Sequence, residues 1–317
     1  MHSLLRYLII LSLAAVPPLS LSAKRSHPKY VTVRTDFELK NSYQLGNQFF
    51  CISTALAYAW DNHFIPVFPF LNESGGNRQY NRDHIFFRLK ATNPKPIQTF
   101  YYDMSWSYKP IPIYKNDLCL VGPFNSWRYF DHHREQLKQL FAPSAEVETY
   151  LQNKYGDLLS QPNTVGVHVR TSDRKTHPHI PFPGLQYFEK AMEYFPHDSL
   201  FVVFSDRINW CKKKFPECFP NKTFIFIDDN HLHDLFLLSK MHNHIISNST
   251  YSWWAAYLSP HTNHTVLVPD GWLGPSFNAS VEDFYLPEWI RVPHDLFSEP
   301  YPEDMYWYDQ KSKSLDN

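Results

Sequence analysis

The 317-residue sequence has no excess of either charge, because 30 Lys and Arg residues stand against 31 Asp and Glu residues. This balance, without a long run of one sign, excludes a dedicated nucleic-acid binder, which needs a basic surface. Glycine is scarce, with 9 residues against 25 prolines, so stiff connections are expected rather than flexible linkers. Four cysteines are too few for a disulfide scaffold at this length, and no internal repeat is visible.

Two motifs of nucleotide enzymes are also missing. No Gly-x-Gly-x-x-Gly sequence occurs, which disfavours a dinucleotide-binding site. No Asp-x-Asp occurs either, so a sugar-nucleotide enzyme built on this chain would have to neutralise its leaving diphosphate with protein donors. Histidine pairs at 177/179, 231/233 and 242/244 have no Cys or carboxylate at a recognised ligand spacing, and we expect no metal site.

Apolar residues, by contrast, are abundant. Hydrophobic residues make up 43% of the chain and aromatic residues 17%, enough for a large core, which excludes disorder for most of the sequence. A single core stops growing beyond roughly 250 to 300 residues, so the length favours two lobes.

The N-terminal residues 1–23 have the pattern of a signal peptide or a signal anchor. Arg6 precedes an apolar run over residues 7–16, which Pro17 and Pro18 end. The run is short for a membrane span, which needs about 20 residues. We expect possible membrane association through residues 4–20 and a membrane-associated or secretory location, a Golgi-type lumen in a eukaryote.

Short apolar runs alternate with helical patterns along the chain, which predicts an α/β fold with parallel sheets and a ligand beyond the carboxyl ends of the strands. In the first half we predict strands at 30–34, 65–68 and 118–121, with helices at 49–60 and 135–140. In the second half we predict strands at 164–169, 200–204, 223–227, 244–246 and 265–268, separated by helices at 185–194, 208–214, 232–241 and 252–258.

Chemically versatile residues lie at and just after the end of the predicted strand at 164–169, namely His168, Arg170 and Asp173. Arginine supplies a planar donor fork that suits a phosphate or a carboxylate. The alternative is an Arg–Asp pair that braces a loop. After the next strand, Asp206 could cap the following helix, accept from a ribose hydroxyl or accept the N1–H and N2–H groups of guanine; capping is the default expectation.

Two polar segments each lead into a predicted helix. Gly46 and Asn47 lie in the loop before the predicted helix at 49–60. Ser249, Thr250 and Tyr251 lie before the predicted helix at 252–258. Free amide groups and the positive end of the dipole would there face a ligand, although helix capping alone is the commoner meaning. Two such helix starts with an Arg between them would form an anion clamp.

Together these segments resemble glycosyltransferase family 11, the α-1,2-fucosyltransferases, in the family's order from about residue 30 to residue 292. The Asn-Ser-Thr-aromatic-Ser-Trp-Trp string at 248–254 is the most specific part. The other similar segments are Leu-Gly-Asn-Gln at 45–48, Gly122 to Phe130, Val167 to Asp173, Phe204 to Asp206 with Trp210 and Cys211, and Val268 to Trp272.

The resemblance implies two facing Rossmann-like lobes of the GT-B type with mostly parallel sheets. It implies an acceptor-side lobe at 27–160 and a donor-binding lobe at 161–295, followed by a tail at 296–317. It further implies an inverting, metal-independent transfer of L-fucose from GDP-fucose to a galactoside hydroxyl in α-1,2 linkage. The partners expected are therefore a nucleotide sugar and a glycan acceptor, without nucleic acid.

The same resemblance assigns roles to single residues. Arg170 would bind the β-phosphate, Asn47 and the 249–251 turn would surround the diphosphate, and His168 and Asp206 would contact guanosine. Asp173 is the candidate general base. Thr171 stands where the family usually has a second Arg, and Asn125 stands where Gln is usual. The alternatives are a related transferase with another nucleotide-sugar donor and a catalytically impaired glycan-binding protein.

Overall fold

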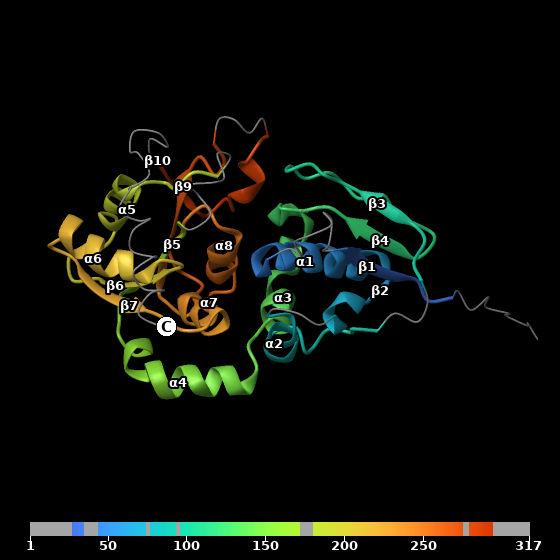
Figure 1. Ribbon diagram of the computed structural model, residues 1–317. Coiled ribbons are helices and arrows are strands. Elements are labelled where there is room, and N and C mark those ends of the chain that lie inside the picture. Colours follow the sequence, from blue (N-terminus) through green and yellow to red (C-terminus); the bar gives the residue numbers. More distant parts are fainter. Residues whose placement is uncertain are drawn as a thin grey trace, which may run out of the picture.

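The structure is a computed structural model that describes residues 27–34, 44–73, 77–92, 96–171, 180–274 and 279–293. Two parallel sheets, one in each of two lobes, form its framework (Figure 1). The predicted leader at 1–23 and tail at 296–317 lie outside the described residues. Within the described part of the chain, no helix is long and apolar enough to cross a membrane.

The first lobe contains a four-stranded sheet in the order β2-β1-β4-β3, with every pair parallel. Helix α1 connects β1 to β2 and is buried along most of its length, because Phe, Ile, Leu and Ala fill nearly all of its faces. The elements of this lobe are β1 (Tyr30–Arg34), α1 (Leu45–Asn62), β2 (Ile65–Pro66), η1 (Pro69–Asn72), α2 (Arg78–His84), β3 (Phe100–Tyr102), β4 (Leu118–Val121), η2 (Trp127–Tyr129), η3 (Asp131–His133) and α3 (Arg134–Leu140).

The second lobe contains a six-stranded sheet in the order β10-β9-β8-β5-β6-β7, again parallel throughout. Alternate residues of β6 point to opposite faces, so that Val202 and Phe204 pack with α7 and α8 while Phe201 and Val203 pack with α5 and α6. The elements are β5 (Thr164–Val169), α5 (Leu185–Met192), β6 (Leu200–Ser205), α6 (Ile208–Cys218), β7 (Thr223–Ile227), α7 (His231–Ser239), β8 (Asn243–Ile245), α8 (Thr250–Tyr257), β9 (Val266–Asp270), η4 (Glu282–Phe284) and β10 (Ile290–Pro293).

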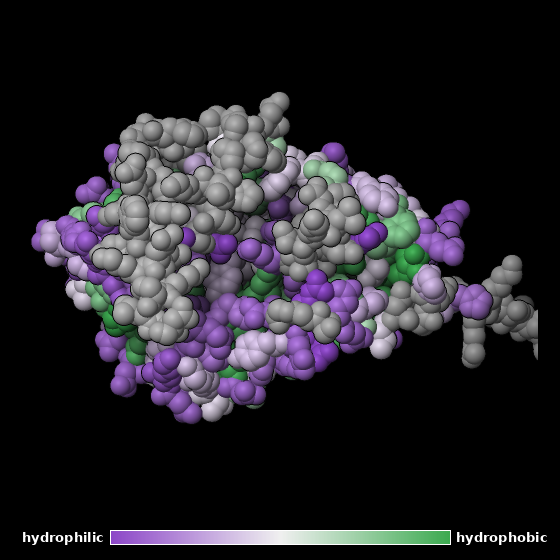
Figure 2. Space-filling view, viewed as in Figure 1, coloured by the Kyte–Doolittle hydropathy of each residue, from purple (hydrophilic) through white to green (hydrophobic). Residues whose placement is uncertain are grey.

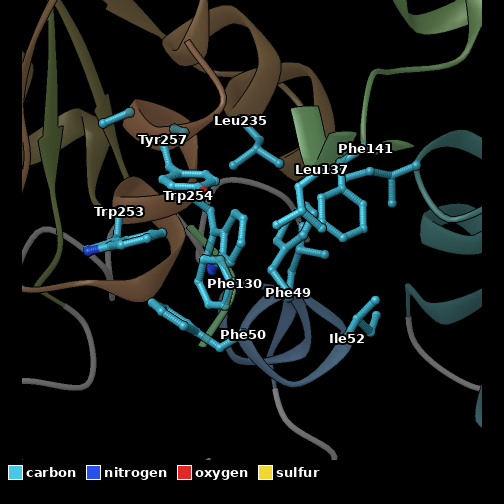
Figure 3. Packing of buried hydrophobic residues seen from close by; sticks show 14 of the residues in the cluster. Phe49, Phe50, Ile52, Phe130, Leu137, Phe141, Leu235, Trp253, Trp254 and Tyr257 are labelled. Carbon is cyan, nitrogen blue, oxygen red and sulfur yellow. The ribbon is translucent and has the colours of Figure 1, made fainter. Parts of the chain in front are cut away.

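A single aromatic core joins the two lobes where α1 meets α8 (Figure 3). Phe49 of α1 stacks on Trp254 of α8 at 4.9 Å between ring centroids, and Phe50 lies 4.7 Å from Trp253. Phe130 also stacks on Trp254, at 5.3 Å between ring centroids. All five rings are fully buried, so the lobes share one hydrophobic interior.

The α/β class and the two mostly parallel sheets predicted from the sequence are confirmed. The predicted starts of two helices are wrong. Helix α1 begins at Leu45, so Gly46 and Asn47 lie inside its first turn, and α8 begins at Thr250, so Thr250 and Tyr251 lie inside its first turn rather than before it. The sequence pattern also missed α4 (Ala145–Leu159), whose buried apolar residues are few and which packs against α7. The lobe boundaries at 160/161 remain our proposal.

Candidate functional site

A cavity of about 820 Å³ lies between the lobes, beyond the carboxyl ends of β5, β6 and β7. The starts of α1 and α8 close it on another side. Seven residues predicted from the sequence line this one cavity, namely Gly46, His168, Arg170, Asp206, Ser249, Thr250 and Tyr251. In the space-filling view, hydrophilic residues predominate on the described surface between the lobes (Figure 2).

Arg170 leaves the end of β5 and forms an ion pair with Asp206, which follows β6. The guanidinium Nε lies 3.3 Å from Oδ2 of Asp206. The other carboxylate oxygen, Oδ1, accepts from the backbone amide of Thr171 at 3.0 Å and from its hydroxyl at 3.2 Å. Asp206 therefore braces the turn after β5 and holds the Arg170 side chain at the cavity wall.

The default expectation that Asp206 caps the next helix is wrong. Helix α6 begins at Ile208 after Arg207, whose amide donates to the hydroxyl of Ser205 at 3.0 Å. Ser205 thus satisfies the amide before the helix start, which leaves the Asp206 carboxylate for Arg170 and Thr171.

The two helix starts at the cavity touch each other through a glycine. A Cβ atom at Gly46 would lie 2.6 Å from the backbone nitrogen of Tyr251, closer than any real side chain allows. Ser249 precedes α8 without capping it through its side chain, and Gln44 likewise precedes α1 without a side-chain cap. Asn47 lies inside α1 and cannot cap it, so the capping interpretation of both segments is wrong. The Asn47 amide donates to the Gln44 carbonyl at 3.0 Å, whereas Leu45 and Thr250, the first residues of the two helices, line the cavity.

His168 and Tyr251 form an aromatic wall. The buried His168 ring shares a 2.8 Å hydrogen bond between Nδ1 and the Ser247 hydroxyl, and its centroid lies 5.4 Å from that of Tyr251. The Tyr251 hydroxyl donates to the His231 carbonyl at 2.6 Å. Burial raises the pKa of Tyr251 well above its usual value, so it is a neutral donor.

The structure adds an acidic wall that sequence reasoning missed, formed by Asp228, Asp229 and Asp234. Asp229 is saturated with donors. Its Oδ2 accepts from the Tyr150 hydroxyl at 2.8 Å and from Lys154 at 2.9 Å, while its Oδ1 faces Nδ1 of His233 at 2.9 Å. These donors hold the pKa of Asp229 well below its usual range despite the opposing effect of burial.

Asp234 differs from Asp229, since its buried Oδ1 has no hydrogen-bond partner among the described residues. Burial, with smaller contributions from the nearby Asp229 and Asp228, raises the pKa of Asp234 to about 7. A carboxyl group that lines a cavity with an unmet acceptor is a candidate for contact with a ligand donor. No motif could have revealed it, because in the sequence it is one polar residue within the predicted helix 232–241.

Two predicted site residues are not among those that line the described cavity, for different reasons. Asp173 lies outside the described residues, and Asn47 is half-buried in the first turn of α1 but does not line the cavity. The first lobe instead contributes Asn77, Arg78 and Asn81 around α2, in a stretch without a readable sequence pattern. Among the described residues, the one group of His, Cys, Asp or Glu side chains close enough to share a metal ion lies elsewhere, at Asp61, His132 and His133.

Curated proteins of known function are similar to part of this chain. The O-antigen biosynthesis glycosyltransferase WbnK of Escherichia coli is 32% identical over 56% of this chain and 62% of its own length. An alpha-1,2-colitosyltransferase of the same organism is also 32% identical, over 56% of this chain and 63% of that protein. Galactoside alpha-(1,2)-fucosyltransferase 1 of Homo sapiens is 30% identical over 56% of this chain and 53% of its own length. The matches thus span less than two thirds of each relative.

Solved structures are similar at lower sequence identity. Fucosyltransferase NodZ from Bradyrhizobium matches 74% of this chain and 96% of its own, with 12% identity and a TM-score of 0.48. FUT1 from Arabidopsis thaliana, in complex with GDP, matches 78% of this chain and 71% of its own, with 15% identity and a TM-score of 0.44.

The family model described as glycosyl transferase family 11 matches residues 9–293, which include both sheets and every described residue of the cavity. The resemblance seen in the sequence motifs is thereby confirmed, and the chain belongs to glycosyl transferase family 11.

Proposed function

We propose that this chain is a galactoside 2-α-L-fucosyltransferase-like enzyme that transfers L-fucose from GDP-fucose to a galactoside hydroxyl in α-1,2 linkage. The observation that carries the proposal is the convergence, in one cavity, of Arg170 with the starts of α1 and α8. Family membership and the names of the fucosyl- and colitosyltransferase relatives support the same reaction type.

The convergent donors suit a nucleoside diphosphate as leaving group. Negative charge grows on the β-phosphate as the glycosidic bond breaks, and donors placed there in advance act where that charge develops. Arg170 supplies the guanidinium, and Asp206 fixes its position. The first-turn amides of α1 and α8 add partial positive charge. In this proposal the protein alone stabilises the diphosphate, without a divalent metal ion.

The guanine base would lie against the acidic wall. We assigned Asp206 to guanosine from the sequence, but both of its oxygens already accept from Arg170 and Thr171. The Asp234 carboxyl group lines the cavity, and its Oδ1 has no hydrogen-bond partner among the described residues, so we propose that Asp234 accepts from the N1–H and N2–H groups of the base. His168 keeps its assignment as a guanosine contact, beside the ring of Tyr251.

Inversion at the anomeric carbon requires the acceptor hydroxyl to attack from the face opposite the diphosphate. Asp173 remains our proposal for the base that takes the acceptor proton. We also keep the proposal that residues 1–23 direct the chain to a membrane or a secretory lumen.

One relative favours a second candidate function, a related transferase with another donor sugar. The alpha-1,2-colitosyltransferase is as similar to this chain as WbnK, at 32% identity. The described cavity residues proposed to face the diphosphate would bind that group in any nucleoside diphosphate sugar. The specificity for the donor sugar must therefore be measured.

The test is a transfer assay with the full chain, a galactoside panel and EDTA. GDP-fucose, GDP-mannose and the GDP-linked deoxysugar colitose are compared as donors, and NMR defines the anomeric configuration and the linkage of the product. The proposal predicts GDP release with GDP-fucose, an α-1,2 product and an unchanged rate in EDTA. GDP binding without transfer to any galactoside would contradict it, and strict dependence on a metal would contradict the metal-independent clamp.

A further inference from the structure

A second cluster of reactive side chains lies at the opposite end of α1 from the cavity. Asp61 is in the last turn of α1, and His132 and His133 form the end of η3. Gly46 and Asp61 are fifteen positions apart in one helix, so the cluster lies about 22 Å along the axis from the cavity. The transfer reaction described above makes no use of it.

Both imidazoles point one nitrogen at the same carboxylate. Nε2 of His132 lies 2.9 Å from Oδ2 of Asp61, and Nε2 of His133 lies 2.8 Å from Oδ1. One ligand atom from each residue falls within 4.8 Å of the others. Zinc bonds of about 2.0 to 2.2 Å at tetrahedral angles place ligand atoms about 3.4 Å apart, so small side-chain adjustments would admit an ion.

The His133 ring is held in its orientation by neighbours on three sides. Its Nδ1 lies 2.7 Å from Oε1 of Gln136, and the Trp60 ring meets it in a T-shaped contact with 4.9 Å between centroids. A histidine that ligates a metal usually donates its other ring N–H to such an acceptor, which directs Nε2 toward the ion. Gln136 on α3 therefore has the position of an orienting partner rather than of a ligand.

The local charges favour a cation at this place. Asp61 adds a negative charge at the C-terminal end of α1, where the helix dipole is already negative, and the last turn of α1 contains no basic side chain. The nearby Arg134 pairs with Asp131 and Glu288 instead. The Asp61 and His132 side chains are 43% and 49% exposed, so an ion can reach the cluster and water can complete its coordination.

We propose that Asp61, His132 and His133 bind one Zn²⁺ ion or a similar first-row divalent ion, with two imidazole nitrogens, one carboxylate oxygen and water as ligands. The ion would tie the C-terminal end of α1 to the turn before α3. Its role is structural, because the cluster is remote from the cavity, and the proposal stands independently of the proposed function.

The test is a zinc titration of the full chain after treatment with EDTA and dialysis, in competition with a chromophoric chelator. We expect one site that Asp61→Asn and His133→Ala abolish, and that Gln136→Ala weakens about 10- to 100-fold. Zinc should also raise the melting temperature of the wild type but not of Asp61→Asn. Since these side chains are exposed or half-buried, circular dichroism should show the variants folded without metal.

The matched control replaces His242 and His261, whose rings stack at 4.6 Å without forming part of a metal-binding group among the described residues. The double variant His242→Ala, His261→Ala should keep the zinc site. The proposal is overturned if Asp61→Asn binds zinc as tightly as the wild type, if the control loses the site, or if zinc leaves the melting temperature of the wild type unchanged.

Discussion

No room for a side chain remains between Gly46 of α1 and Thr250 of α8, because a Cβ atom on Gly46 would lie 2.5 Å from the Thr250 hydroxyl oxygen. The carbonyl carbon of Thr250 would be 2.6 Å away. The two helix starts that frame the cavity are thus in direct backbone contact, and the spacing of their amides depends on this glycine.

Gly46→Ala should therefore push α1 away from α8. We expect a loss of about 1–3 kcal/mol in the free energy of unfolding, as for other overpacked sites, together with a loss of transfer. Denaturant titration and initial rates measure the two effects. The control is Gly156→Ala in α4, where the added Cβ meets the flexible end of Gln152 at 3.2 Å. That change should be neutral or stabilising. Equal stability of the two variants would argue against a tight contact at Gly46.

Arg170→Ala should lower the turnover rate about 10²- to 10³-fold, since one donor to the developing charge is lost. The fold should remain, because Asp206 still accepts from Thr171. Arg291→Ala is the matched control, since that guanidinium pairs with Asp270 and Glu282 outside the cavity lining. If Arg170→Ala turns over at nearly the rate of the wild type, Arg170 does not stabilise the developing charge.

Thr171→Arg, which restores the usual residue of the family, should destabilise the protein rather than activate it. Thr171 is fully buried and donates twice to Asp206, so the larger side chain would overfill the turn. Thr171→Val removes only the hydroxyl donor and should cost about 1.5–3 kcal/mol, because the acceptor is charged. Thr171→Ser keeps the hydroxyl and serves as the control. Urea unfolding of the three variants measures these changes in stability. A Thr171→Arg enzyme that is as stable as the wild type and faster would refute the prediction that arginine overfills the turn.

Asp234 should make stability and GDP binding respond to pH in opposite directions. Its pKa in the folded protein is about 7, above the ordinary value of about 3.9. Its stabilising contribution is complete below pH 4 and is lost as pH rises through 7, because the charged form is penalised by burial. GDP affinity should instead increase over this range, since the carboxylate is the better acceptor.

Thermal unfolding and calorimetry with GDP between pH 5 and 8 test this prediction for the wild type and Asp234→Asn. As pH rises, the melting temperature of the wild type should fall relative to that of Asp234→Asn. In the variant, GDP affinity should no longer depend on pH. Asp83→Asn, at an exposed pair with Arg82, is the control and should follow the wild type. If Asp234→Asn keeps the pH dependence of GDP affinity, the guanine base does not bind to Asp234.

The positions of several cavity residues were predictable because parallel strands end at one edge of a sheet. His168 lies near the end of β5, Arg170 follows that strand and Asp206 follows β6, and this rule alone brought them together. The start of α1 was misplaced by four residues, because Gly46 and Asn47 are poor helix formers and the close packing of Gly46 against α8 is a tertiary contact that the sequence pattern does not show.

Other features could not be predicted because they depend on contacts between distant segments. Asp234 became recognisable only in the structure, where it lines the cavity and its buried Oδ1 has no hydrogen-bond partner among the described residues. His132 and His133 are adjacent in sequence, but Asp61 is about seventy positions earlier, and no spacing rule connects them. The partners of Asp206, namely Arg170 and Thr171, likewise became visible only in the structure, and its assignment to guanosine stays an untested prediction.

The aromatic core across α1 and α8 has a consequence for motion. Phe49, Phe50 and the two tryptophans of α8 would have to separate if the lobes swung apart, exposing rings that are now fully buried. We therefore expect heating to melt both halves in one cooperative step, and substrates to enter and leave through side openings and local loop movements rather than by a hinge.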